Sequence, residues 1–336
     1  MPRVLYVPLS GSSGTGEAQR CLLIAQAAKL RWPRLEQHFV LSRHVPNVDS
    51  WPFLAHLLPR SPALDARILI KTMQDLRPDV VLFDSAAGRA ALTAARAIGA
   101  RTVYLSSCPS ARKRGYSWRY LPLIDEHWQV HLPLADGGPG WFERYLYRLR
   151  PLPKVFNLGP LFEQPDTDTS TEVLTKFAVT KRSFLLVCPD DATADTPYHA
   201  CAQVLRARGH QVVCVLARKP ANSDSRDSGR VTPAELIALL RNAKLAVVNG
   251  GSLFAQSLVC ATPAVGAALA SDQAARLKRM ARLGLTTHAG ASAPELFAAT
   301  ERALAGADMV RSRLAGLGLK NGMPAALDRL AVLAGC

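Results

Sequence analysis

Residues suited to chemistry gather where apolar runs of the chain end. The run 245–248 stops at a polar turn, a helix-like segment spans 253–260, and the apolar run 263–269 also ends in polar residues. The first turn contains Asn249, Gly250, Gly251 and Ser252, and the second contains Ser271, Asp272 and Gln273. Glycine lets the backbone approach a ligand, and the N–H groups that start a helix suit a phosphate. The pattern favours an anion site, although an ordinary turn between strand and helix has the same spacing.

A second glycine-rich turn lies near the start of the chain. The apolar run 3–9 leads into residues that include Gly14, Gly16 and Glu17, and a helix is predicted from 18 to 32 because Pro33 stops it. The glycine spacing fits neither a nicotinamide-dinucleotide site nor a Walker loop. Since ligands bind at the carboxyl ends of parallel strands, we expect Glu17, Asp84 and the segment 106–110 on one rim.

The elements that must position these residues alternate along the chain. Short apolar strands are predicted at 3–9, 37–42, 80–83, 101–105, 184–188, 210–216 and 245–248, with helices between them and an irregular stretch at 43–63. Thr232, Pro233 and Glu235 form a helix start with an N-cap and a capping partner. Such alternation is typical of a parallel sheet with helices on both faces. We therefore predict an α/β protein with two Rossmann-like domains that face each other across a cleft.

The boundary between the predicted domains lies near Gly159 and Pro160. A chain of 336 residues is long enough for two domains. We expect an N-terminal domain at 1–155, a linker at 156–171, where a turn and a polar run follow each other, and a C-terminal domain at 172–336.

Composition and charge limit the class of protein. The formal net charge of +15 attracts anionic partners such as nucleotide phosphates, nucleic acid or an acidic membrane face, although charge that serves solubility gives the same excess. The seven cysteines are scattered without paired spacing, so we expect a reducing cytoplasm and no metal site. No apolar run reaches the length of a membrane span, and the chain starts directly with a strand, so no signal peptide is expected.

Two segments interleave cations with aromatic residues. The first, 111–121, contains Arg112, Arg114 and Trp118, and the second spans 141–154. Such segments can lie at a lipid headgroup layer or bind single-stranded nucleic acid, and the second can equally be a surface helix whose aromatic residues face the core. We assign Arg112, Arg114 and Trp118 to acceptor or membrane contact and expect no nucleic-acid partner.

Three motifs together resemble those of the GT-B glycosyltransferases. Residues 14–20 resemble the G-x-G-H-x-x-R motif of that family, residues 249–252 resemble its H-G-G-[ST] turn, and residues 270–273 resemble the segment whose Asp-Gln meets the donor sugar. The chain is most similar to the bacterial branch related to the lipid-linked peptidoglycan N-acetylglucosaminyltransferase and to the UDP-glycosyltransferases. The motifs span about 270 residues in the order that the family shows.

The resemblance implies a metal-independent enzyme that needs no cofactor and uses a nucleotide-sugar as co-substrate. Its C-terminal domain would hold the nucleotide-sugar, with Asp272 and Gln273 on the sugar. The donor-binding residues would be Asn249, Gly250, Gly251, Ser252, Asp272 and Gln273 of that domain, together with Gly14 and Gly16 of the N-terminal turn. Its N-terminal domain would hold a hydroxyl acceptor on an envelope glycolipid or glycan, with Glu17 and Asp84 as catalytic carboxylates. We expect a cytoplasmic monomer that binds peripherally to the inner face of the cytoplasmic membrane.

Departures from the family motifs leave two alternatives open. Glu17 and Asn249 stand where the family has histidines, and Ser257 stands where it often has a ribose-binding glutamate. Residues 14–25 also resemble the start of bacterial hydrolases that release a free sugar from a nucleotide-sugar. The chain could therefore be such a hydrolase, or a non-catalytic relative on the same fold.

Overall fold

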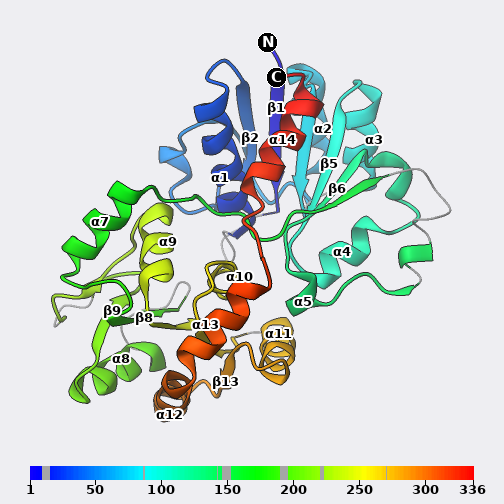
Figure 1. Cartoon of the computed structure of the whole chain (residues 1–336). Helices are drawn as coiled ribbons and strands as arrows, with labels where there is room; N and C mark the ends of the chain where they lie inside the picture. Colours follow the sequence, from blue (N-terminus) through cyan, green and yellow to red (C-terminus); the bar gives the residue numbers. More distant parts are fainter. Residues whose placement is uncertain are drawn as a thin grey trace. The chain divides into compact units, whose positions relative to one another are not determined.

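The computed structural model describes residues 1–9, 16–85, 88–141, 143–145, 153–189, 196–219, 223–269 and 271–336. The described chain divides into two compact units. Unit 1 contains residues 1–131, 137–161 and 322–336, and unit 2 contains residues 132–136 and 162–321. Each unit has its own parallel sheet with helices against it, which confirms the predicted α/β class and its two domains (Figure 1).

Unit 1 is built on a seven-stranded sheet in the order β3-β2-β1-β4-β5-β6-β7, in which every neighbouring pair is parallel. The strands are β1 (Arg3–Pro8), β2 (Glu36–Ser42), β3 (Leu54–Leu58), β4 (Val80–Asp84), β5 (Arg101–Ser106), β6 (Glu126–Gln129) and β7 (Lys154–Asn157). The α-helices are α1 (Gly16–Arg31), α2 (Ala66–Leu76), α3 (Arg89–Ala97), α4 (Pro109–Gly115) and α14 (Met323–Ala334). The strand order reverses between β1 and β4, which is where open sheets of this kind bind ligands.

Helices cover both faces of this sheet because its central strands are apolar on both sides. Successive residues of a strand point to opposite faces. On β1, Val4 and Tyr6 belong to a buried cluster with α1 and α14, whereas Leu5 and Val7 belong to a cluster with α2 and α3. A strand covered on one face needs apolar residues only at alternate positions. These strands are covered on both faces, which explains their continuous apolar runs.

Unit 2 repeats this plan on a six-stranded parallel sheet in the order β10-β9-β8-β11-β12-β13. The strands are β8 (Phe184–Cys188), β9 (Gln211–Val215), β10 (Asp227–Ser228), β11 (Leu245–Asn249), β12 (Ala264–Ala267) and β13 (Thr287–Ala289). The helices are α5 (Pro133–Asp136), α7 (Thr167–Lys176), α8 (Pro197–Ala207), α9 (Pro233–Asn242), α10 (Ser252–Val259), α11 (Ser271–Arg282), α12 (Ala293–Ala305) and α13 (Ala307–Gly316). Here the order reverses between β8 and β11.

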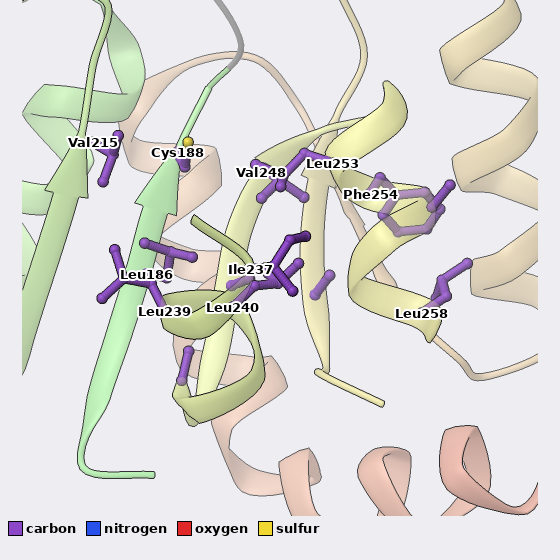
Figure 2. Packing of buried hydrophobic residues seen from close by; sticks show 14 of the residues in the cluster. Leu186, Cys188, Val215, Ile237, Leu239, Leu240, Val248, Leu253, Phe254 and Leu258 are labelled. Carbon is purple, nitrogen blue, oxygen red and sulfur yellow. The ribbon is translucent and has the colours of Figure 1, made fainter. Parts of the chain in front are cut away.

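The core of unit 2 lies on both faces of this sheet. Leu186 of β8 and Val248 of β11 lie against Ile237 and Leu240 of α9 on one face, as Figure 2 shows. On the other face, alternate residues of the same strands contact α8 and α12. Helix α9 starts as predicted, because the Thr232 hydroxyl and the side chain of Glu235 cap each other's backbone N–H groups.

Two stretches that the sequence placed outside the sheet are the edge strands of unit 1. Within the stretch predicted to be irregular, β3 pairs with β2 from His38–Leu54 to Ser42–Leu58. At the start of the predicted linker, β7 pairs with β6 from Glu126–Lys154 to Gln129–Asn157. Both strands are largely accessible to solvent, so they lack the buried apolar run by which a strand is recognised in a sequence.

The unit boundaries also differ from those expected. Residues 322–336 belong to unit 1 rather than to the C-terminal domain, because Met323, Ala326 and Leu330 of α14 form an apolar stripe that joins the α1 side of the unit 1 core. Residues 132–136 belong to unit 2, where Leu132 and Ala135 enter the core. No helix in the described ranges is both long and apolar enough to span a bilayer.

Candidate functional site

Charged residues gather at the carboxyl ends of β1, β4 and β5 in unit 1. Glu17 and Arg20 lie three residues apart at the start of α1 and so share one face of that helix. Arg20 donates Nε to Asp84 Oδ2 at 2.7 Å and Nη2 to Asp84 Oδ1 at 2.9 Å. Its Nη2 also reaches Ser107 Oγ at 3.2 Å. The structure thus brings Glu17 and Asp84 together as predicted, and adds Arg20, which was part of the quoted motif but received no role from the sequence.

The two carboxylates have different environments. The Asp84 side chain is fully buried, and burial raises its pKa while the Arg20 guanidinium opposes that rise. Glu17 is half-buried, and its pKa is raised first by burial and then by the charge of Asp84, against a lowering by Arg20. Both oxygens of Asp84 are bound within the protein, so Glu17 is the more accessible of the two carboxylates.

Of the two glycines that the sequence assigned to the donor in this turn, only Gly16 is described. Gly14 lies outside the described residues. Gly16 is the first residue of α1, and a Cβ built there would meet no atom within 4 Å. No close approach of neighbouring atoms therefore requires a glycine at position 16.

The basic-aromatic segment 111–121 divides between interior and surface. Arg112 is buried: its Nη1 lies 3.2 Å from His131 Nε2, and its Nε lies 3.7 Å from Glu143 Oε2. Its charge is therefore paired inside unit 1, and burial leaves little of the side chain accessible to the acceptor or membrane that the sequence predicted for it. Arg114 donates Nη1 to the Ser85 carbonyl at 3.0 Å.

Three aromatic residues of the two segments lie at the surface, whereas Tyr116 is buried. Trp118 is 65% exposed, and the guanidinium of Arg119 lies 5.3 Å from the centre of its ring. In the segment 141–154, Trp141 is 81% exposed and Tyr145 is 53% exposed. The predicted amphipathic helix there lies partly outside the described residues, since 142 and 146–152 are not covered.

A buried histidine that the sequence did not single out lies beneath α4. The His127 ring is enclosed by the edges of Tyr104 and Tyr116, at 5.3 and 5.2 Å between ring centres, and its Nε2 lies 2.8 Å from Ser106 Oγ. A Cβ at Gly115 would lie 2.6 Å from the ring, so only glycine fits there. Burial, followed by the nearby His131 and Arg112, lowers the pKa of His127 to about 3. No pattern in the sequence distinguishes such a histidine from an exposed one.

In unit 2, the glycine turn follows β11 and leads into α10 (Figure 1). The Gly250 N–H donates to the Ala267 carbonyl at 3.3 Å, so it continues the pairing of β11 with β12. A Cβ at Gly250 would lie 2.8 Å from the Cβ of Gln273 and 3.0 Å from Leu277. This glycine is therefore required by the close approach of α11. Gly251 is the N-cap residue of α10 and is half-buried, no side chain caps the helix, and Ser252 is exposed.

An arginine behind this turn orients its peptide groups. Arg276 of α11 donates Nη1 to the Gly250 carbonyl and, at 3.4 Å, to the Gly251 carbonyl. Its Nε donates to Asp136 Oδ1 at 2.7 Å, and both side chains are buried. The C=O and N–H of a trans peptide point in opposite directions, so the N–H groups of Gly251 and Ser252 point away from Arg276. The Gly251 N–H is donated to Asn249 Oδ1 at 3.3 Å, so the Ser252 N–H at the start of α10 is the one directed to an anion.

The other predicted donor residues have mixed surroundings. Asn249 is buried and accepts the Gly251 N–H through Oδ1 at 3.3 Å. Gln273 accepts the Leu269 N–H through Oε1 at 2.9 Å, which leaves its amide N–H groups for other partners. Asp272 lies in α11, but its side chain is outside the description. Ser257 is fully buried and donates to the Phe254 carbonyl at 2.7 Å, so its hydroxyl is bound within α10.

Comparison of the whole chain with solved structures identifies its fold. A UDP-glycosyltransferase of Siraitia grosvenorii, solved in complex with UDP, superposes with a TM-score of 0.63 at 13% identity, over 100% of both chains. A UDP-glucosyltransferase from Polygonum tinctorium gives 0.63 at 16% identity, over 100% of this chain and 99% of that one. The spinosyn forosaminyltransferase SpnP gives 0.61 at 16% identity, over 98% and 99%. No protein-family model and no curated protein matches the sequence. Two parallel-sheet units in this order, matched along their full length, give the chain the GT-B fold of these glycosyltransferases.

Proposed function

We propose that the protein is a nucleotide-sugar-dependent glycosyltransferase. The observation that carries this proposal is the glycine turn of unit 2, where Arg276 holds the Gly250 and Gly251 carbonyls and the Ser252 N–H at the start of α10 is directed away from it, on a fold whose solved examples include one in complex with UDP. In such a reaction the nucleoside diphosphate leaves with a negative charge, and aligned N–H groups at the start of a helix stabilise that charge. The proposal includes a reaction without a metal, so EDTA should leave turnover unchanged.

On the donor side, the Ser252 N–H would bind the diphosphate, joined by the Gly251 N–H if the diphosphate displaces Asn249 Oδ1 from it. Gln273 lies beside the same turn, and its free amide N–H groups would bind a sugar hydroxyl. On the acceptor side, Glu17 would accept the proton of the acceptor hydroxyl, since it is the accessible carboxylate of the rim and its pKa is raised. Asp84 would support it rather than react.

The finer proposal is that the acceptor is a glycolipid of the cell envelope and that the protein binds peripherally to a membrane, as in the bacterial branch with lipid-linked acceptors. Exposed Trp118, Trp141 and Tyr145, with the exposed cations Arg119 and Arg144 near them in the sequence, support it. Rings of this kind lie at the interface of a bilayer, and cations bind anionic headgroups.

Nucleotide binding tests the donor part of the proposal. Thermal melting with UDP, dTDP, GDP, ADP and CMP should show stabilisation by one nucleotide, of about 2.7 kcal/mol at 100 times its Kd. The stabilisation should disappear in a folded Gly251→Trp variant, because the indole would cover the turn. The absence of any shift, together with isothermal titration that detects no binding, would favour the non-catalytic relative, for which the buried Ser257 is the supporting observation.

Turnover tests the acceptor part. Glu17→Gln should keep the nucleotide affinity of the wild type and lose about 10²- to 10⁴-fold in rate, the range that a general base contributes. Release of free nucleotide that needs no acceptor would instead identify a hydrolase.

A further inference from the structure

The sheet edge of unit 1 that carries Glu17 also carries an ion pair, and the proposed role of Glu17 as proton acceptor does not by itself explain that pair. Arg20 uses two nitrogens to bind both oxygens of Asp84, at 2.7 and 2.9 Å, and one of these nitrogens also binds Ser107. The Asp84 side chain is 0% exposed and the Arg20 side chain is 15% exposed. Burial of an ion pair is weak support for stability, because desolvation offsets most of the attraction. A fork-shaped guanidinium does, however, fix geometry.

The backbone that follows Asp84 is also held in an uncommon conformation. Ser85 has a φ of 60°, in the left-handed region that residues other than glycine rarely adopt. Its Oγ lies 3.3 Å from Asp84 Oδ1, and its carbonyl accepts Nη1 of Arg114 at 3.0 Å. Strained residues of this kind persist where the surroundings over-determine them, and they cluster at functional sites. Asp84 is thus fixed through its side chain by Arg20 and through the next residue by Arg114.

We propose that Arg20 is a positioning residue, whose ion pair with Asp84 anchors the start of α1 to the end of β4 and so holds the Glu17 carboxylate at the rim as its proton acceptor. The proposal rests on the proposed function for the identity of the reaction, but the arrangement itself does not. Glu17 and Arg20 share one helix face, so a bond that fixes Arg20 also fixes the turn that carries Glu17.

The charges around Glu17 follow from this arrangement. The cation Arg20 and the buried, neutral thiol of Cys21 come from α1, Asp84 comes from β4, and Arg114 reaches the residue after Asp84 from α4. The Asp84 charge acts on Glu17 in the direction opposite to that of Arg20. Glu17 therefore reports, through its own titration, whether the ion pair is present and ionised.

The experiment measures the Glu17 carboxyl by NMR, with ¹³C-labelled glutamate and a pH titration of the whole chain, and it needs no substrate. The Glu17 resonance is assigned by its disappearance in Glu17→Gln. In Asp84→Asn, the titration midpoint of Glu17 should move to lower pH, because the nearby negative charge is gone while the Arg20 cation remains. Asp79→Asn, at the exposed residue immediately before β4, is the matched control and should leave the midpoint where the wild type has it.

A second variant covers the case in which the unpaired Arg20 prevents folding. The double substitution Arg20→Gln with Asp84→Asn leaves no unpaired buried charge, and it should move the Glu17 midpoint downward by less than Asp84→Asn. Arg20→Lys keeps the charge but loses the fork, so it should hold the midpoint near the wild-type value while broadening or shifting the Glu17 resonance, because the start of α1 is no longer fixed.

Two results would overturn the proposal. One is a Glu17 midpoint in Asp84→Asn that equals that of Asp79→Asn. The other is an Arg20→Lys spectrum in which the Glu17 resonance is unchanged, since a pair that merely stabilises the fold would leave it so. If no nucleotide binds but the NMR midpoints shift as expected, the proposed transferase function is rejected and the positioning role of Arg20 stands.

Discussion

Acid should destabilise unit 1 through His127. The perturbation is a change from pH 7.5 to pH 5.0. At 0% exposure the imidazole is held neutral, and its Nδ1 has no hydrogen-bond partner in the described part of the chain. An imidazolium would carry a second N–H without an acceptor, close to the Arg112 charge that already lowers its pKa.

The magnitude follows from proton linkage. The folded pKa of about 3 lies below the ordinary value of 6.5, so the unfolded chain binds the proton more tightly, and stability is lost as the pH falls below 6.5 towards 3. At pH 5.0 the unfolded state is 1.5 pH units below its pKa, which corresponds to about 2 kcal/mol. The folded state takes up almost no proton at that pH, so this value holds for any folded pKa below about 4.

The assay is urea unfolding followed by tryptophan fluorescence. All five tryptophans of the chain lie in unit 1, at 32, 51, 118, 128 and 141, so the signal reports that unit. Wild type should lose about 2 kcal/mol more unfolding free energy between the two pH values than His127→Phe does. His127→Phe also loses the contact with Ser106. That loss lowers the unfolding free energy of the variant at both pH values, so it cancels in the difference between them. The matched control is His44→Phe, which replaces an exposed histidine of the same unit and should retain the wild-type difference. An equal pH dependence in wild type and His127→Phe would refute the reasoning.

Three further predictions concern other parts of the chain. Gly115→Ala should lower the unfolding free energy of unit 1 by about 1–3 kcal/mol, since the new Cβ would lie 2.6 Å from His127; an unchanged urea midpoint would contradict it. Arg276→Lys should weaken UDP binding about tenfold without affecting uridine, because it loosens the turn that faces the phosphates; Lys278→Met on the exposed side of α11 is the control, and calorimetry measures both. Replacing Trp118 and Trp141 together by serine should reduce sedimentation with phosphatidylglycerol vesicles, whereas Leu317→Ser in unit 2 should not, and equal sedimentation of all three proteins would count against membrane binding.

Local patterns predicted much of the architecture. The central strands of both sheets are runs of apolar residues because they are covered on both faces, and the capping box at Thr232 and Glu235 depends only on residues three apart. The edge strands β3 and β7 were missed for the converse reason: half-exposed strands do not show that run.

The sequence predicted where some candidate site residues lie but not which partners surround them. The sequence placed Glu17 and Asp84 on one rim, because strand ends can be counted along the chain. It assigned Gly250 to the donor, and the structure adds that the α11 side chains leave no room for a Cβ there. It assigned Arg112 to acceptor or membrane contact, and the structure buries that side chain. It did not identify Arg276, whose partner Asp136 lies 140 residues away.

The sequence by itself determined the fold class, the strand ends that carry polar residues and the overall charge, because each of these depends on residue types and on spacings of a few positions. Only the tertiary structure decided which carboxylate is buried against Arg20, which arginine orients the glycine turn, and that the last helix returns to unit 1. The physical reason is that burial and ion pairing are properties of a three-dimensional neighbourhood. A guanidinium has the same formula in water and in a core, and its charge acquires a role only from the groups that folding brings within about 4 Å of it.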